Sequence, residues 1–230
     1  MTAVGNLLRT RSTELELLDG ERLDAIELST NLREMAMLNR LPGGSGDSVR
    51  MVERVLGEQS EGTVLDIGTG SGDFVRRLRR KRHAEVIAAD VRPEILEIAS
   101  RNLAGLNHVS LIKADVKELP LADREVDVTH ASLLMHHLDP DDAITALAEM
   151  RRVSRLGVVI NDLRRGPVPF ALTAAAVLAF SHGAYTRHDG VLSARRAYTL
   201  SELDTLAARA GLRRAYRSPW FWPRVTTVYR

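Results

Sequence analysis

The sequence of 230 residues contains no cysteine. This absence excludes disulfide bonds, thiolate-bound metal sites and a cysteine nucleophile, and it is compatible with a reducing compartment. Aromatic residues make up only 4% and the formal net charge is only +2, so no overall charge favours a nucleic acid partner. The longest apolar run, Val168 to Phe180, is shorter than the roughly 20 residues of a transmembrane helix. Residues 1–30 have no apolar core of signal-peptide length, so we expect a cytoplasmic protein without a transmembrane segment.

Apolar residues make up 44% of the chain and charged residues 27%, a composition typical of a globular protein. The chain is long enough for one well-buried core and too short for two full domains. A glycine-rich segment, Leu41 to Gly46, interrupts the pattern after an irregular amphipathic stretch. We therefore expect an amino-terminal helical arm over residues 1–47 and one main domain over residues 48–230.

Short apolar runs alternate with helical patterns through the main domain. The expected strands are Thr63–Ile67, Glu85–Ala89, Ser110–Lys113, Val126–Ala131 and Gly157–Ile160. The expected helices are Ser48–Leu56, Gly72–Lys81, Pro93–Leu103, Pro140–Val153 and Leu200–Ala210. Near-continuous apolar strands need cover on both faces, so the pattern predicts a doubly wound α/β fold with a mostly parallel sheet. Two further strands, Arg213–Trp222 and Val225–Tyr229 with a turn at Trp222-Pro223, predict an antiparallel C-terminal hairpin and seven strands in all.

The strongest local signal is the run from Val64 to Phe74, VLDIGTGSGDF, in which an apolar strand leads through three alternating glycines into a helix. Glycine tolerates the backbone angles of a tight turn and lets a ligand approach the main chain. The helix behind the turn offers unpaired N–H groups. A dinucleotide site would have its third glycine one position later, where this chain has Asp73. The pattern therefore does not favour a nicotinamide or flavin cofactor.

Two acidic residues end the next strands of the predicted sheet. Asp90 follows an apolar run and could accept hydrogen bonds from both hydroxyls of a ribose. Asp115 follows the next strand and could accept a hydrogen bond from an adenine amino group. Each carboxylate could instead cap a helix or a turn.

Together these residues resemble the class I S-adenosylmethionine (SAM) dependent methyltransferases, in particular the small-molecule branch that includes quinone-biosynthesis enzymes. The resemblance spans about residues 62–160 and implies that SAM is the cofactor. It implies that the methionine part is held around the glycine turn and the fourth strand, at Asp66, Gly68, Thr69, Gly70, Ala131 and Ser132. It implies that the ribose and adenine are held by Asp90, Val91, Asp115 and Val116.

Two adjacent histidines, His136 and His137, follow the fourth strand at the edge where open α/β sheets bind ligands. Either could act as a general base toward a hydroxyl acceptor, or could pack against the sheet and bond the backbone. Adjacent residues of a helix point in different directions, and no further ligand pattern accompanies the pair. We therefore expect no metal site.

The segment from about residue 161 to 198 is predicted to be an insert that forms a lid. Its first half is apolar nearly all round, which suits the cover of a hydrophobic acceptor. Its second half carries polar groups, including His188, a third candidate base. Asp189-Gly190 could equally be the turn of an ordinary loop.

These patterns predict SAM-dependent methyl transfer to a mostly apolar small molecule, with O-methylation of a phenolic, quinone or polyketide-like acceptor favoured. Such a displacement chiefly requires alignment and exclusion of water. The alternatives are methyl transfer to RNA or protein, and a SAM-binding protein of the same fold that does not methylate. A basic run over residues 76–83 could bind phosphates, but no aromatic platform accompanies it, and a solvated helix face explains it as well. The sequence makes no prediction of the oligomeric state.

Overall fold

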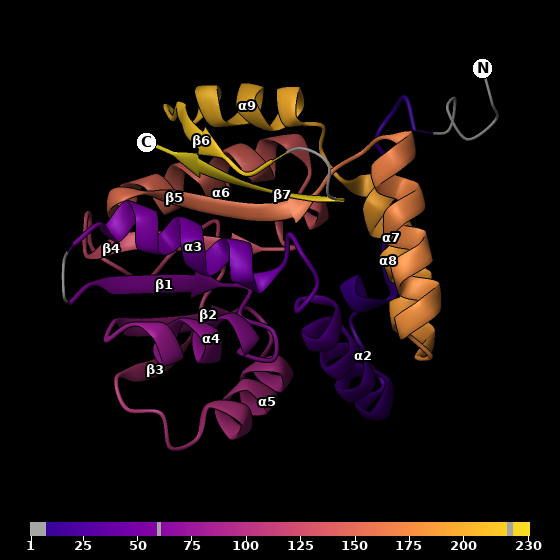
Figure 1. Ribbon diagram of the computed structural model, residues 1–230, viewed down its shortest axis with the longest axis horizontal. Coiled ribbons are helices and arrows are strands. Elements are labelled where there is room, and N and C mark those ends of the chain that lie inside the picture. Colours follow the sequence, from indigo (N-terminus) through magenta and orange to yellow (C-terminus); the bar gives the residue numbers. More distant parts are fainter. Residues whose placement is uncertain (1–7, 59–60, 220–222) are drawn as a thin grey trace.

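The computed structural model describes residues 8–58, 61–219 and 223–230. In these ranges a seven-stranded sheet has the order β3-β2-β1-β4-β5-β7-β6 (Figure 1). The strands are β1 (Thr63–Ile67), β2 (Glu85–Asp90), β3 (Val109–Lys113), β4 (Val126–Ser132), β5 (Ser154–Leu163), β6 (Arg214–Arg217) and β7 (Arg224–Tyr229). Neighbouring strands pair in parallel along the part of the sheet with the order β3-β2-β1-β4-β5. Strand β7 pairs antiparallel with both β5 and β6. The predicted doubly wound α/β fold with an antiparallel C-terminal hairpin is confirmed.

Helices cover both faces of this sheet, because the strands bury apolar side chains on both sides. On one face, α3 (Ser45–Leu56), α4 (Asp73–Lys81) and α5 (Pro93–Leu103) pack against strand residues such as Val64 and Val128. On the other, α6 (Pro140–Val153) and α9 (Leu200–Arg209) pack against Leu65 and Ile160. Full burial of one such side chain stabilises the fold by about 1.5–3 kcal/mol. This two-sided core fixes the carboxyl edge of the sheet, where the loops that follow β1 and β4 emerge.

A third layer lies beyond that edge, next to the ends of β1 and β5 (Figure 1). It consists of η1 (Leu17–Asp19) and α2 (Ala25–Leu38) from the amino-terminal arm with α7 (Pro167–Phe180) and α8 (Ala184–Arg196) from the insert. Two carboxylates of α2 hold the start of α8: Glu34 accepts hydrogen bonds from the N–H groups of His182 and Gly183, and Glu27 accepts one from Ala184. They satisfy N–H groups that a helix start leaves without a partner. The arm and the insert therefore form one structural layer.

Several predicted boundaries differ from the structure. Helix α3 begins at Ser45, so the boundary at residue 47 falls inside it, and residues 161–163 belong to β5 rather than to the insert. Asp189-Gly190 is no turn, since both residues lie within α8. Glycine suits that helix because a Cβ atom on Gly190 would lie 2.7 Å from Cγ2 of Val177 in α7. The predicted turn at Trp222-Pro223 and the end of the sixth strand lie partly outside the described residues.

None of the helices in the described ranges is long and apolar enough to cross a membrane.

Candidate functional site

A cavity of about 220 Å³ lies between the carboxyl edge of the sheet and the layer of α2, α7 and α8. Its lining includes Gly68, Thr69 and Gly70 of the glycine turn. Charged side chains, among them Glu16, Asp73 and Arg224, also line it. An apolar wall is made by Leu32, Met35, Leu163, Ala176 and Val177. Helix α2 closes over the glycine turn, because a Cβ atom on Gly70 would lie 3.7 Å from Cδ2 of Leu32. One cavity therefore brings together the turn, the arm and the insert.

The glycine turn has the backbone conformation that the sequence predicts. Gly68 and Gly70 have φ angles of 68° and 54°, in the left-handed region that favours glycine. Asp66, near the end of β1, contacts the turn through its carboxylate. One of its carboxylate oxygens accepts a hydrogen bond from Oγ1 of Thr69 at 2.8 Å, and the other lies 2.7 Å from Nδ1 of the buried His130. Asp66 therefore has partners within the protein as well as a place in the cavity lining.

The other predicted cofactor residues lie along the same edge of the sheet. Asp90 is buried at the end of β2, where it accepts a hydrogen bond from the N–H of Arg92, and burial raises its pKa. Asp115 is exposed beyond β3 and accepts the N–H of Lys117, while Val116 beside it is buried. Because β1, β2 and β3 are parallel neighbours, their acidic ends form a row along one edge. Ser132 lines the cavity. The predicted cofactor residues that do not line the cavity are Asp90, Val91, Asp115, Val116 and Ala131.

A buried arginine and a buried aspartate in the cavity lining have hydrogen-bonding capacity to spare. Arg224, at the start of β7, is 7% exposed and donates to three neutral oxygens, on Asn161, Asn39 and Ser132. A guanidinium has five N–H groups, so others stay available. Burial lowers the pKa of Arg224 to about 10. Oδ2 of Asp73 is buried without a hydrogen-bond partner, and burial raises the pKa of Asp73. Together they fit a zwitterion, a ligand with both a carboxylate and an ammonium group.

The loop after β4 turns sharply into the short helix η2 (Met135–His137). Leu133 has a φ of 55°, a conformation that is costly for a residue with a branched side chain, and its N–H donates to the carbonyl of Asn161 at 2.9 Å. Such strain costs about 1–3 kcal/mol and is often found at functional sites. This turn directs His136 and His137 toward the cavity.

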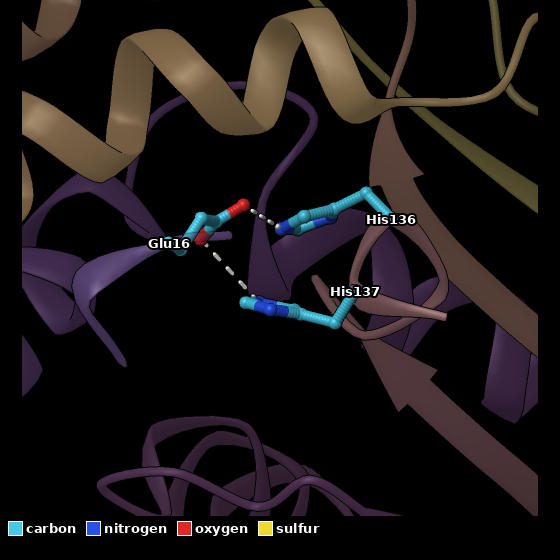
Figure 2. Close-up of side chains that lie close together, drawn as sticks. All are labelled: Glu16, His136 and His137. Atoms are coloured by element: carbon cyan, nitrogen blue, oxygen red, sulfur yellow. Dashed lines mark ion pairs between the residues drawn. The ribbon is translucent and has the colours of Figure 1, made fainter. Parts of the chain in front are cut away.

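The two histidines do not point in different directions, and that part of the prediction is wrong. In the short 3-10 helix η2 the two rings lie side by side, with centroids 4.4 Å apart. Nδ1 of His136 lies 2.6 Å from Oδ1 of Asp162, and Nδ1 of His137 lies 2.8 Å from Oδ1 of Asp19. Both Nε2 atoms face Glu16, at 3.8 Å from Oε1 and 3.7 Å from Oε2 respectively (Figure 2).

Glu16, which faces both histidines, comes from the amino-terminal arm, and nothing in the local sequence predicts its place in the cavity. Its backbone turns the carboxylate inward to 4% exposure, while the neighbouring Leu15 and Leu17 are exposed. Burial raises the pKa of Glu16 to about 7, and its Oε1 has no hydrogen-bond partner. The segment is fixed from α8, since the carboxylate of Asp189 accepts the N–H groups of Leu17 and Leu18. We call Glu16, His136 and His137 the Glu–His–His cluster.

Charges from three other segments surround this cluster. Asp162 lies near the end of β5, and contact with His136 outweighs the effect of burial and holds the pKa of Asp162 below its usual range. Arg196 of α8 forms an ion pair with Asp19 and donates to the carbonyl of His137 at 2.9 Å. Sequence reasoning missed Glu16, Asp162 and Arg224. The position of Asp162 at a strand end was an available signal, whereas nothing local distinguishes Glu16.

His188 does not lie with the other two candidate bases. Its side chain is 53% exposed, pairs with Oδ1 of Asp189 at 2.8 Å and is absent from the cavity lining. Helix periodicity explains this, because the residues of α8 that do line the cavity, Thr186, Asp189, Gly190 and Ser193, share the opposite side of the helix.

Comparisons with known proteins agree with this geometry. Residues 64–157 match a family described as a methyltransferase domain. A malonyl-acyl-carrier-protein O-methyltransferase of Serratia marcescens is 28% identical over 188 residues, which cover 78% of this chain and 68% of that protein. A ubiquinone/menaquinone biosynthesis C-methyltransferase of Desulfotalea psychrophila is 32% identical over 109 residues, or 47% of this chain and 43% of that protein.

Among solved structures, a SAM-dependent methyltransferase from Aquifex aeolicus superposes with a TM-score of 0.62 at 20% identity, covering 90% of this chain and 98% of that one. At this identity the likeness concerns the fold. With the sequence matches, it confirms the resemblance drawn from the glycine turn. The chain is therefore similar to the class I SAM-dependent methyltransferases in its central residues 64–157 and in its fold.

Proposed function

We propose that this protein uses SAM to methylate an oxygen of a mostly apolar small molecule that presents a neutral hydroxyl group. One observation carries the proposal: the glycine turn of the cofactor site and the Glu–His–His cluster line the same cavity, with an apolar wall between the arm and the insert. A methyl donor at the turn and an acceptor hydroxyl at the cluster would then face each other in a space closed by α2, α7 and α8. Such alignment and exclusion of water are what the displacement requires.

The residues that would hold SAM form two groups. Arg224 is proposed to bind the carboxylate of its methionine part and Asp73 the ammonium group, beside the turn of Gly68 to Gly70. The row of acids along the sheet edge is proposed to hold the adenosine, with Asp90 and Val91 at the ribose and Asp115 and Val116 at the adenine. When bound, SAM supplies a methyl group on a positively charged sulfur, which makes it electrophilic.

The Glu–His–His cluster is proposed to activate the acceptor hydroxyl. Asp162 holds Nδ1 of His136 and so directs Nε2 of that ring toward the cavity. As the new oxygen–carbon bond forms and the sulfur–carbon bond breaks, with its electron pair left on sulfur, the hydroxyl proton passes to Nε2 of His136. A positioned base of this kind contributes about 10²–10⁴-fold in rate.

The charge around the cluster favours a hydroxyl over a carboxylate as acceptor. The carboxylates of Glu16, Asp19, Asp162 and Asp189 gather there, and Arg196 is already paired with Asp19. A carboxylate of the acceptor brought into this partly buried site would meet like charge, which is costly away from water. The Serratia relative is named for an acid acceptor, whereas the apolar wall and negative cluster here support a phenolic, quinone-type or polyketide-like hydroxyl.

A matched pair of acceptors tests this proposal. The purified chain is incubated with SAM carrying a labelled methyl group and either a naphthol or the naphthoic acid of the same ring system. We expect label to enter the naphthol ether at least about ten times faster than the naphthoate ester, because only the acid adds a negative charge. Equal or reversed rates would contradict the hydroxyl assignment. Transfer of label to RNA or protein, with neither acceptor labelled, would support the alternative substrates.

A further inference from the structure

The Glu–His–His cluster places two imidazoles and a carboxylate face to face, and Nη1 of Arg196 lies 3.8 Å from Oε1 of Glu16. Each imidazole has its Nδ1 against an aspartate, at 2.6 Å for His136 and 2.8 Å for His137. An Nδ1–H that donates to a carboxylate leaves a lone pair on Nε2. Both lone pairs then face the carboxylate of Glu16, whose Oε1 is buried without a hydrogen-bond partner. A metal ion or a hydrogen-bond donor such as a hydroxyl group can occupy the space between these atoms favourably.

The spacing of the three groups is too wide for a shared proton. The Nε2 to carboxylate distances are 3.8 Å for His136 and 3.7 Å for His137, and the candidate ligand atoms all lie within 4.8 Å of one another. A hydrogen bond between such atoms would bring them to about 2.7–3.2 Å. Two ligands about 2.1 Å from a tetrahedral metal ion lie about 3.4 Å apart. A contraction of the cluster toward this spacing would therefore complete a metal site.

We propose that Glu16, His136 and His137 bind a divalent transition-metal ion such as Zn²⁺ through one carboxylate and two Nε2 atoms. Two imidazoles and a carboxylate suit ions of this class rather than Mg²⁺ or Ca²⁺, which prefer oxygen ligands alone. Asp162 and Asp19 complete the arrangement as outer partners, since a metal-binding histidine commonly donates its second ring N–H to a carboxylate.

Three protein ligands leave a coordination position open, and all three residues line the cavity. The inference deepens the proposed function and rests on it for the acceptor: the acceptor oxygen would occupy the open position. The ion would then lower the pKa of the hydroxyl in place of the imidazole. It would also offset the negative charge that the surrounding carboxylates bring to the site.

Metal binding is measured on the full chain after dialysis against a chelator, without SAM or acceptor. Zn²⁺ is titrated calorimetrically, and Co²⁺ is added separately to record the visible absorption of a low-symmetry site. We expect one ion per chain in the wild type. Glu16→Gln and His137→Asn should weaken binding by at least about 100-fold, and Asp19→Asn, which keeps all three ligands, by about 10- to 100-fold. His108→Asn is the matched control, because His108 pairs with Glu85 at 3.8 Å on the surface, far from the cavity.

The control should bind Zn²⁺ as the wild type does. Stoichiometric binding that is weakened as expected in Glu16→Gln, His137→Asn and Asp19→Asn, each with an unchanged circular dichroism spectrum, supports the site. Wild-type binding no stronger than that of Glu16→Gln overturns it, as does equal loss in His108→Asn. Asp19→Asn keeps the proposal testable if a ligand variant does not fold.

Methyl transfer is measured on the same samples. Turnover that stays complete in chelated protein, without Zn²⁺ binding, overturns the metal site and leaves the proposed function standing. Zn²⁺ binding without any SAM binding supports the site and contradicts the proposed function.

Discussion

Replacement of Arg224 by glutamine separates the proposed contact with the SAM carboxylate from the structural role of this side chain. The guanidinium is 7% exposed, and no carboxylate of the described residues forms an ion pair with it. A hydrogen bond to a charged partner contributes about 1.5–3 kcal/mol. Since 1.4 kcal/mol corresponds to a factor of ten, the Kd for SAM should rise about 10- to 100-fold in Arg224→Gln.

The assay is a thermodynamic cycle that uses SAM and decarboxylated SAM, which differ only in the carboxylate. Wild-type protein should bind SAM about 10- to 100-fold more tightly than the decarboxylated form, by the same hydrogen-bond energy. Arg224→Gln should bind the two with nearly equal affinity, because the partner of the carboxylate is gone. The difference between the two ratios measures the coupling between Arg224 and the carboxylate, free of general effects on folding.

Loss of any buried arginine also destabilises a protein, so a matched variant is needed. Arg165 is equally buried, at 7% exposure, and donates to the carbonyls of Leu8 and Ala197, but it is absent from the cavity lining. Arg165→Gln should lower the melting temperature yet keep the wild-type preference for SAM. The reasoning is refuted if Arg224→Gln retains that preference, whatever its overall affinity.

Three further predictions concern the cofactor edge, the outer partner of His136 and the core. Asp90→Ala should weaken SAM binding by about 10- to 100-fold in calorimetry, because a buried carboxylate that accepts the ribose hydroxyls is lost; an unchanged Kd would remove Asp90 from the ribose site. Asp162→Asn should lower kcat on the order of 100-fold with KM for SAM unchanged, since His136 loses its orientation; a rise in KM alone would contradict this. Met150→Ala should lower the free energy of unfolding by about 2–5 kcal/mol in a denaturant titration, because Met150 is fully buried. Ile26→Ala, at a side chain that is 76% exposed, is its control and should leave it nearly unchanged.

The cofactor half of the site could be predicted because its signals are local. The turn of Gly68 and Gly70, and the acid that ends the next strand, each lie within one strand–loop–helix unit. Apolar runs located the strands for the same reason. The end of β5 was missed because residues Asn161 to Leu163 are polar or near the insert, and they are strand residues only through pairing with Thr226, Val225 and Arg224 of β7. Such pairing between distant segments is not visible in a local pattern.

The acceptor half could not be predicted because its members are distant in the sequence. Glu16 and His136 meet only because Asp189 of α8 holds the backbone of Leu17 and Leu18, and α8 itself was not expected. Its Asp-Gly pair is typical of a turn, but here the aspartate is a buried acceptor and the glycine permits close packing of two helices. Tertiary contacts override the local preference at both positions.

The same arrangement makes the arm a part of the proposed acceptor site, because Glu16 lines the cavity. Glu16 has no local reason to be buried, since its leucine neighbours Leu15 and Leu17 are left exposed while its carboxylate turns inward. Burying a carboxylate without full hydrogen bonding is unfavourable, and such an arrangement persists in a folded protein where it serves binding or chemistry. His137 and Arg196 supply part of the compensation, since their nitrogen atoms lie 3.7 Å and 3.8 Å from the carboxylate oxygens of Glu16. An acceptor hydroxyl or a metal ion at Oε1 would supply the remainder.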